Sequence, residues 1–188
     1  MSLNEKIKTA RKGTSDSVRK ANLVQMGKEM QIVLFNLNTV LYGVDVNQVQ
    51  GVLEMQEITT VPNAPHYIEG VTNLRGDVIP VVDLRKKFGL DSVESETEST
   101  KKMMVIGQGE SATGVLVDAV MEVLNISKDD VDEVPDVVSS DDTDHMLGVA
   151  KHNEDLVILL NLMNVVGQSK IQDYGSYATE AIDVAAVA

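Results

Sequence analysis

The stretch Gly43-Val-Asp-Val-Asn-Gln-Val-Gln-Gly-Val-Leu53 returns in altered form as Gly114-Val-Leu-Val-Asp-Ala-Val-Met-Glu-Val-Leu124. The two segments lie 71 positions apart and share six of eleven residues. A second pair of segments, 67–89 and 145–167, aligns at an offset of 78. Self-similarity at a nearly fixed spacing indicates a repeated structural unit. The sequence therefore predicts one unit of structure that is used twice along the chain.

Each unit is predicted to contain about five short strands and to end in a helical turn. Asp83 is a good N-cap for a turn that stops at Gly89, and Asn161 for a turn over 162–166 that stops at Gly167. A polar Asn-Thr pair at 38–39 separates the first two runs and predicts a hairpin. The β-branched-rich runs are 30–37, 40–46, 49–55, 78–84, 103–106, 113–120 and 156–162. The predicted fold is mainly β, a sandwich or barrels, with two small units sharing a core.

The chain divides into a structured region and flanking segments of different composition. Residues 29–167 form the predicted domain, with barrel units at about 30–90 and 103–167. The polar segment 91–102 between them is predicted to be a linker. The basic leader, 1–28, is interpreted as flexible, with contact to anionic lipid or an acidic partner as the alternative. Residues 168–188 are interpreted as a tail or a docked helix.

Composition excludes several classes of protein. The net charge of −13 disfavours nucleic acid as a partner, because that affinity comes mainly from Lys and Arg at phosphates. The chain has no Cys, which excludes disulfides and thiol catalysis and fits a reducing compartment. Apolar runs reach about five residues, whereas a membrane helix needs about 20, so no membrane insertion is expected. The N-terminus lacks a signal-peptide pattern, and a cytoplasmic location is predicted.

No catalytic or metal-binding motif is found. The three histidines, His66, His145 and His152, fit neither an HExxH nor an HxH arrangement. The acidic run from Asp129 to Asp144 lacks the Gly and Glu positions of an EF-hand loop. No Gly-x-Ser-x-Gly elbow is present. The sequence therefore predicts a non-enzymatic protein without cofactor or metal.

Duplication makes the differences between the units informative. Arg75 stands beside Gly76 where the second unit has Asn153 and Glu154. An Arg fork suits recognition of a partner's carboxylates, but an internal ion pair to Asp77 or Asp83 is an equal alternative. Gly51 stands where the second unit has Glu122. This glycine marks either a bulge, a close backbone approach or a tolerated small residue on an exposed face.

A specific resemblance is carried by the segment 60–90. Its core, Gly70-Val-Thr-Asn-Leu-Arg-Gly76 followed by Pro80-Val-Val-Asp-Leu-Arg85, closely resembles the signature of the CheW family of chemotaxis coupling proteins. The resemblance extends over roughly 28–166. It implies a fold of two intertwined five-stranded SH3-like β-barrels related by internal duplication. It also implies an adaptor without catalysis, recruited to membrane-associated chemoreceptor arrays.

The resemblance implies two partners. One is the cytoplasmic tip of methyl-accepting chemotaxis receptors, a helical hairpin lying in the groove between barrels. Such binding needs an apolar strip with a few polar anchors. The positions that match this receptor contact are Val49, Gly70, Arg75, Gly114 and Val120.

The other implied partner is the regulatory domain of a CheA-type histidine kinase, which is similar in fold and packs barrel against barrel. Many relatives carry a Glu at the position of Gly51, and that acid is associated with kinase contact. Its absence here puts this contact, or the identity of the partner, in question. The matching positions are Val44, Val46, Gly51 and Val52.

Two other functions are alternatives to the adaptor. A small-molecule-binding β-barrel sensor would need a closed apolar pocket with buried polar groups. An enzyme would need carboxylates that converge in a cleft. An adaptor needs neither of these features and predicts an open, shallow groove.

Overall fold

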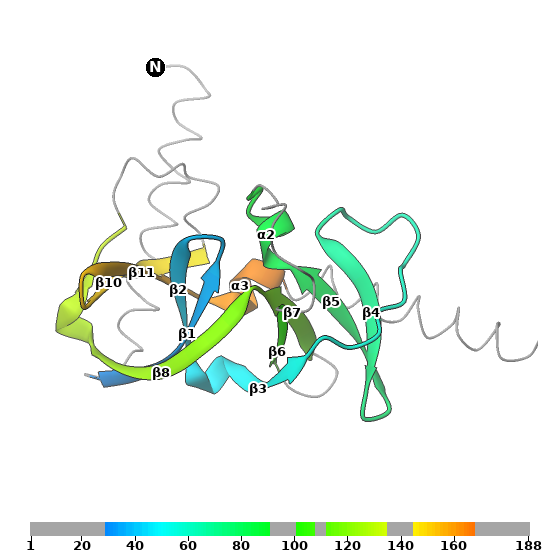
Figure 1. Cartoon of the computed structure of the whole chain (residues 1–188), viewed down its shortest axis with the longest axis horizontal. Helices are drawn as coiled ribbons and strands as arrows, with labels where there is room; N and C mark the ends of the chain where they lie inside the picture. Colours follow the sequence, from blue (N-terminus) through cyan, green and yellow to red (C-terminus); the bar gives the residue numbers. More distant parts are fainter. Residues whose placement is uncertain (1–28, 91–100, 108–111, 135–144, 168–188) are drawn as a thin grey trace, which may run out of the picture.

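The computed structural model describes residues 29–90, 101–107, 112–134 and 145–167. The leader 1–28, most of the linker 91–102 and the tail 168–188 lie outside these residues. The described part is mainly β, with strands gathered into two sheets and a few short helical turns (Figure 1). The predicted fold class is confirmed.

Two sheets, here called sheet A and sheet B, contain the strands. The order in sheet A is β8 (Ala119–Ser127), β1 (Glu29–Leu37), β2 (Val40–Asp45), β11 (Asp155–Leu160), β10 (Met146–His152) and β9 (Val131–Asp132). The order in sheet B is β3 (Val49–Glu54), β6 (Lys102–Ile106), β7 (Thr113–Val117), β5 (Asp77–Asp83) and β4 (Ile68–Leu74). The helical turns are α2 (Leu84–Lys87) and α3 (Leu162–Val166), with 3-10 turns η1 (Val46–Gln48) and η4 (Lys128–Asp130).

The two repeated units exchange strands. Strands β1 and β2 of the first unit lie in sheet A between β8 and β11 of the second unit. Strands β6 and β7 of the second unit lie in sheet B between β3 and β5 of the first. The two sheets have the same order of equivalent strands. When each strand of sheet A is replaced by its equivalent in the other repeated unit, the order becomes that of sheet B, and β9 is the extra strand of sheet A. The intertwining implied by the family resemblance is therefore confirmed.

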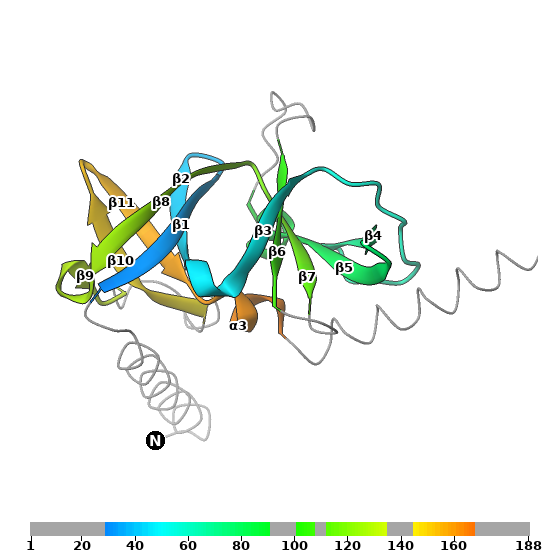
Figure 2. The ribbon, with the colours of Figure 1, turned by 90° about the horizontal axis from the view of Figure 1, so that it is seen from below.

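The sheet boundaries do not follow the repeat boundaries. Sheet B is built from one continuous stretch, 49–117, whereas sheet A combines 29–45 with 119–160. The chain passes from sheet A to sheet B at 46–48, and returns at Asp118. These two places are called the first and second crossover below. Figure 2 shows β3 and β8 leaving these points toward opposite sheets.

Successive side chains of β1 and β6 point alternately to the two faces of the strand, and each face is covered by a hydrophobic core. Val33 and Phe35 face a central cluster to which both sheets contribute, as do Met104 and Ile106 of β6. Ile32 and Leu34 face the interior of sheet A. Their equivalents, Met103 and Val105, face the interior of sheet B. Successive residues of a strand point to opposite faces, so one strand serves two cores. The shared core expected from the repeat is confirmed.

Both predicted helical turns are present. The Asp83 side chain accepts a hydrogen bond from the backbone N–H of Lys86 at 3.2 Å. Asn161 caps α3 in the same way, through the N–H of Asn164 at 3.3 Å. Gly89 and Gly167 follow the turns with φ of 63° and 56°, which is the left-handed conformation that stops a helix. Such a cap contributes about 1 kcal/mol, enough to fix where each turn begins.

Candidate protein-binding surface

Val49 and Val120 lie just after the two crossovers. Val49 is the first residue of β3 and pairs with Ile106, while Val120 pairs with Phe35 at the beginning of β8. Both are half-buried and pack on the central cluster. The first crossover is shaped by Asp45, whose side chain accepts from the Asn47 N–H at 2.8 Å. The structure thus places both residues at one core, with part of each side chain left open to a partner.

Arg75 occupies the tip of the β4–β5 hairpin. Its φ of 57°, followed by 101° at Gly76, makes a two-residue turn with two positive φ angles. The Asn73 side chain accepts from the Gly76 N–H at 3.0 Å and so fixes the turn. Arg75 is exposed and has no ion pair or hydrogen bond within the described ranges. The pairing with Asp83 that was considered for Arg75 is not formed, because Asp83 binds Lys101 and caps α2.

Three of the predicted contact residues lie inside the protein. Val44 is fully buried in the central cluster. Gly114 is buried, and a Cβ there would approach Met103 Sδ at 2.8 Å. Gly70 is buried with φ of 149°, and a Cβ would overlap the Thr59 carbonyl. These residues position the strands of the surface, and their side-chain positions do not face a partner.

Strand β3 forms one edge of sheet B and carries the predicted kinase positions Gly51 and Val52, while Val46 lies just before it in η1. The register shifts between Val49 and Gly51, as expected where Gly51 marks a bulge. A Cβ at Gly51 would meet nothing within 4 Å, so no close backbone approach occurs there. Val52 is 41% exposed, and Val46 in η1 is half-buried. An edge strand with open backbone groups and an exposed Val is suited to a protein contact.

Sequence reasoning missed two exposed apolar residues on β8, Met121 and Val123. They are 57% and 54% exposed and lie two residues apart, on one face of the edge strand of sheet A. Their repeat equivalents are Gln50 and Val52 on β3, at the edge of sheet B. The edge strands of the two sheets therefore present equivalent positions. The repeat alignment pairs Val123 with Val52, and this pairing could have identified the exposed residues on β8 from the sequence.

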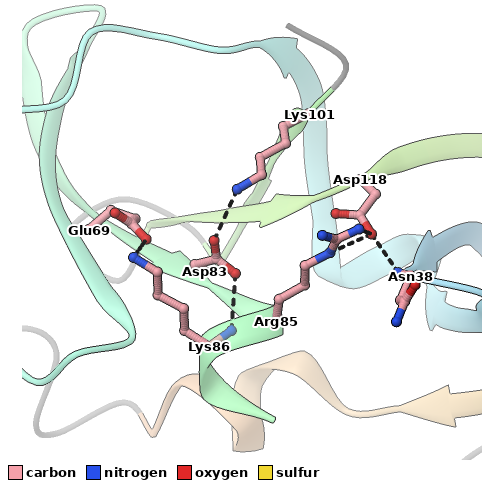
Figure 3. Close-up of polar contacts among 7 residues, drawn as sticks. All are labelled: Asn38, Glu69, Asp83, Arg85, Lys86, Lys101 and Asp118. Atoms are coloured by element: carbon pink, nitrogen blue, oxygen red, sulfur yellow. Dashed lines mark hydrogen bonds and ion pairs between the residues drawn. The ribbon is translucent and has the colours of Figure 1, made fainter. Parts of the chain in front are cut away.

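A charged network lies where α2 meets the second crossover (Figure 3). Arg85 Nη2 lies 2.5 Å from Asp118 Oδ2, and both side chains are buried. On the other side of α2, Lys86 pairs with Glu69 at 2.5 Å, and Lys101 pairs with Asp83 at 3.3 Å. These pairs connect α2 to β4 and to the second crossover, and the end of β5 to the residue before β6.

The described residues contain no cluster of three or more His, Cys, Asp or Glu side chains able to hold a metal. No helix within the described ranges is long and apolar enough to span a bilayer. A hollow of about 250 Å³ lies beside β4. The residues predicted for partner contact do not line it. Its lining residues are Gln56, Glu57, Thr59, Val71, Thr72, Asn73 and Val78.

Comparison with known proteins assigns this arrangement to a family. The family model described as the CheW-like domain matches residues 31–170, which include every strand except the first two residues of β1. This chain belongs to the CheW-like domain family. The match covers both sheets and both crossovers, so it applies to the whole described domain.

CheW proteins of several bacteria are similar along most of their length. The chemotaxis protein CheW of Treponema pallidum is 28% identical over 156 residues, 82% of this chain and 92% of that protein. The chemotaxis protein CheW of Thermotoga maritima is 31% identical over 146 residues, 78% of this chain and 93% of that protein. The crystal structure of the scaffolding protein TtCheW from Thermoanaerobacter tengcongensis superimposes with a TM-score of 0.66 and 32% identity, covering 74% of this chain and 94% of that one.

Proposed function

We propose that this chain is a non-catalytic adaptor of chemotaxis signalling, which couples the cytoplasmic tip of methyl-accepting receptors to the regulatory domain of a CheA-type kinase. The observation that carries the proposal is the CheW-like match over 31–170, together with relatives that are chemotaxis CheW proteins and a scaffolding protein. Such an adaptor works in the cytoplasm, at the receptor tips.

The receptor contact is assigned to Arg75, Val49 and Val120. Arg75 offers a guanidinium fork that no described residue occupies, on a turn fixed by Asn73. Val49 and Val120 offer apolar surface that the central core leaves partly open. A helical hairpin needs this combination of apolar strip and polar anchor. Gly70 and Gly114 support the contact from inside the strands.

The kinase contact is assigned to the edge of sheet B at Val46, Gly51 and Val52. Gly51 supplies no side chain, so this contact depends on the exposed Val52 and on the free edge of β3. Val44 supports it from the central core. With no carboxylate at position 51, apolar burial rather than an ion pair carries this interaction, and its affinity depends little on salt.

Signalling by such an adaptor requires no chemical step. A receptor state changes kinase activity when the adaptor binds the alternative states with different free energies. The residues assigned to the two partners are distinct but adjoin at the first crossover, where Val46 of the kinase contact lies in η1 and Val49 of the receptor contact begins β3.

The test is a crossed calorimetric titration with the kinase regulatory domain and a receptor tip fragment from the same genome. Arg75→Ala is expected to weaken receptor binding about tenfold and to leave kinase binding unchanged, because a well-placed charged anchor contributes about 1.4 kcal/mol or more. Val52→Asp is expected to show the reverse pattern. Lys151→Ala, an exposed cation in the equivalent hairpin of the second unit, serves as the control.

The result decides between the adaptor and its alternatives. Binding of both partners with the crossed pattern supports the proposed function and the two assigned surfaces. Binding that both variants leave unchanged keeps the coupling role and removes these residue assignments. Absence of binding to every kinase and receptor of the same genome overturns the coupling role.

A further inference from the structure

We infer that Arg85 and Asp118 are positioning residues that fix sheet A against sheet B, and thereby set the spacing of Val49 and Val120. The inference rests on the proposed function where it names the receptor tip as the ligand of that surface. The clamp itself follows from contacts within this chain. Neither residue needs to touch a partner.

Asp118 connects the two sheets through contacts with Asn38, Asn36 and Arg85, and Figure 3 shows those with Asn38 and Arg85. Asp118 Oδ2 accepts from the backbone N–H of Asn38, in the β1–β2 turn of sheet A, at 2.5 Å. Its own N–H donates to the Asn36 carbonyl of β1 at 3.2 Å. The same Oδ2 receives Arg85 Nε at 2.7 Å and Nη2 at 2.5 Å. Arg85 belongs to α2, which directly follows β5 of sheet B.

The side chains of Arg85 and Asp118 are 8% and 5% exposed, so the pair is almost shut off from water. Charge-assisted hydrogen bonds are strong at buried sites, and each forms only over a small range of distances and angles. A buried pair of this kind adds little net stability over an apolar pair, but it favours one arrangement over others. The pair therefore serves to define orientation rather than to hold the protein folded.

The first crossover lacks this clamp. The repeat equivalents of Asp118 and Arg85 are Asn47 and Met163, at offsets of 71 and 78. Here α3 reaches the crossover by a Met163 N–H that donates to Gln48 Oε1 at 3.4 Å. A second weak bond joins the Gly107 N–H to the Gln48 carbonyl at 3.4 Å. The second crossover is thus fixed by a buried ion pair, whereas the first has an exposed contact between Asp45 and Asn47 and two long neutral bonds to Gln48.

Val120 lies two residues after Asp118, and Val49 two residues after Asn47. Val49 lies on β3 of sheet B and Val120 on β8 of sheet A, so a shift of one sheet against the other moves the two valines relative to each other. Movements of packed units occur at a few element-terminal residues that absorb the change. The clamp at Asp118 restricts that movement, and so presents the receptor with one spacing of the apolar strip.

The repeat itself suggests the test variant. The double substitution Arg85→Met with Asp118→Asn gives the second crossover the residues that the first one has. It removes both charges together, so no lone charge stays buried. The chain has no Cys, and spin labels can therefore be placed at Glu154→Cys in sheet A and Asp77→Cys in sheet B without background labelling. Both of these residues are exposed turn-end positions.

The distance distribution between the labels is expected to broaden in the double variant at unchanged thermal stability. Receptor binding is expected to fall about tenfold, as when the competent arrangement drops to about a tenth of the population. Kinase binding is expected to change less, because Gly51 and Val52 of the proposed kinase contact both lie on β3 within sheet B. An unchanged distribution in a folded double variant overturns the clamp. If the wild-type chain binds no receptor, the proposed function fails. The distances between the labels still test whether Arg85 and Asp118 fix the orientation of the two sheets.

Hydrogen exchange of the wild-type chain gives a test that needs no variant. The Asn38 and Asp118 amides at the clamped crossover are expected to exchange at least about tenfold more slowly than those of Gly107 and Met163 at the other, because local opening is governed by how firmly each contact is held. Equal exchange at the two crossovers contradicts the inference, and slower exchange at the second crossover supports it.

Discussion

Val49 and Val120 occupy equivalent positions in the two repeated units, and each lies at the beginning of a strand that has just passed to the other sheet. Each is half-buried against the central cluster that both sheets share. The surface they offer therefore belongs to neither sheet alone. A ligand that touches both valines senses how the sheets are oriented.

Val49→Ala and Val120→Ala are each expected to weaken receptor binding, with a loss of about 1 kcal/mol apiece from reduced apolar burial. In the double variant the losses should be coupled by more than about 0.5 kcal/mol, since in the proposed complex one rigid hairpin contacts both residues. Calorimetric titration of the four proteins gives this coupling. Val40→Ala, a 36% exposed valine in the β1–β2 hairpin, is the control. Losses that simply add would mean that the two valines do not share a ligand.

Gly70→Ala is expected to destabilise the fold by about 3 kcal/mol, because a positive φ and a backbone clash act together. The φ is 149°, and the new Cβ would displace the Thr59 carbonyl that accepts from the Val71 N–H. Gly51→Ala is the matched control, with open space around its Cβ, and should leave stability unchanged or raise it by about 0.5 kcal/mol. Chemical denaturation measures both. Equal effects of the two substitutions would refute the structural role of Gly70.

Arg85→Met by itself is expected to cost about 3–5 kcal/mol of folding free energy, because it leaves the Asp118 carboxylate buried without its cation. Adding Asp118→Asn should restore most of the loss, to within about 1 kcal/mol of the wild-type chain. Urea denaturation of the two variants measures the difference. If the double variant is as unstable as the single one, the pair holds the fold together and does not merely orient it.

Tyr42 makes stability sensitive to alkaline pH. Its ring stacks between Phe35 and Phe88, and burial raises the pKa of its hydroxyl above the usual 10.0. Above pH 10 the unfolded chain releases this proton while the folded chain retains it, so stability falls as pH rises, by about 1.4 kcal/mol for each unit between the two pKa values. Thermal unfolding from pH 8 to 11 should show this fall, and Tyr42→Phe should reduce it. If stability falls equally in the Tyr42→Phe variant, the loss of stability at alkaline pH comes from other titratable groups.

Local signals predicted the elements whose chemistry is local. The caps Asp83 and Asn161, with Gly89 and Gly167 after them, fixed both helical turns. The run 113–120 is rich in β-branched residues, which predicts one strand. In the structure it divides at Asp118 into β7 and β8, since the chain changes sheet there. Burial of that carboxylate depends on Arg85, 33 positions away, which no local pattern reveals.

The exchange of strands could not be derived from the repeat. Equivalent strands have the same alternation, so β6 could pair with a strand of its own unit or of the other one without any change in pattern. The resemblance to a known family supplied that choice. The sequence likewise does not show which side chains face solvent. The candidate site could therefore be predicted as a set of residues, but not as a surface. Val44, Gly70 and Gly114 match the family's pattern, yet lie in the interior.

The arrangement of sheet B as one continuous stretch between the two parts of sheet A also sets an order of events during synthesis. All strands of sheet B, 49–117, are synthesised before the first residue of β8 is added. The β1–β2 hairpin emerges earliest, but its neighbours β8 and β11 emerge last, so Phe35 and Ile32 stay without their final cover for most of translation. Apolar strands exposed in this way invite wrong pairing with other nascent chains. The segment made first is thus among the last to be completed, and premature termination after β7 yields one finished sheet joined to an unpaired hairpin.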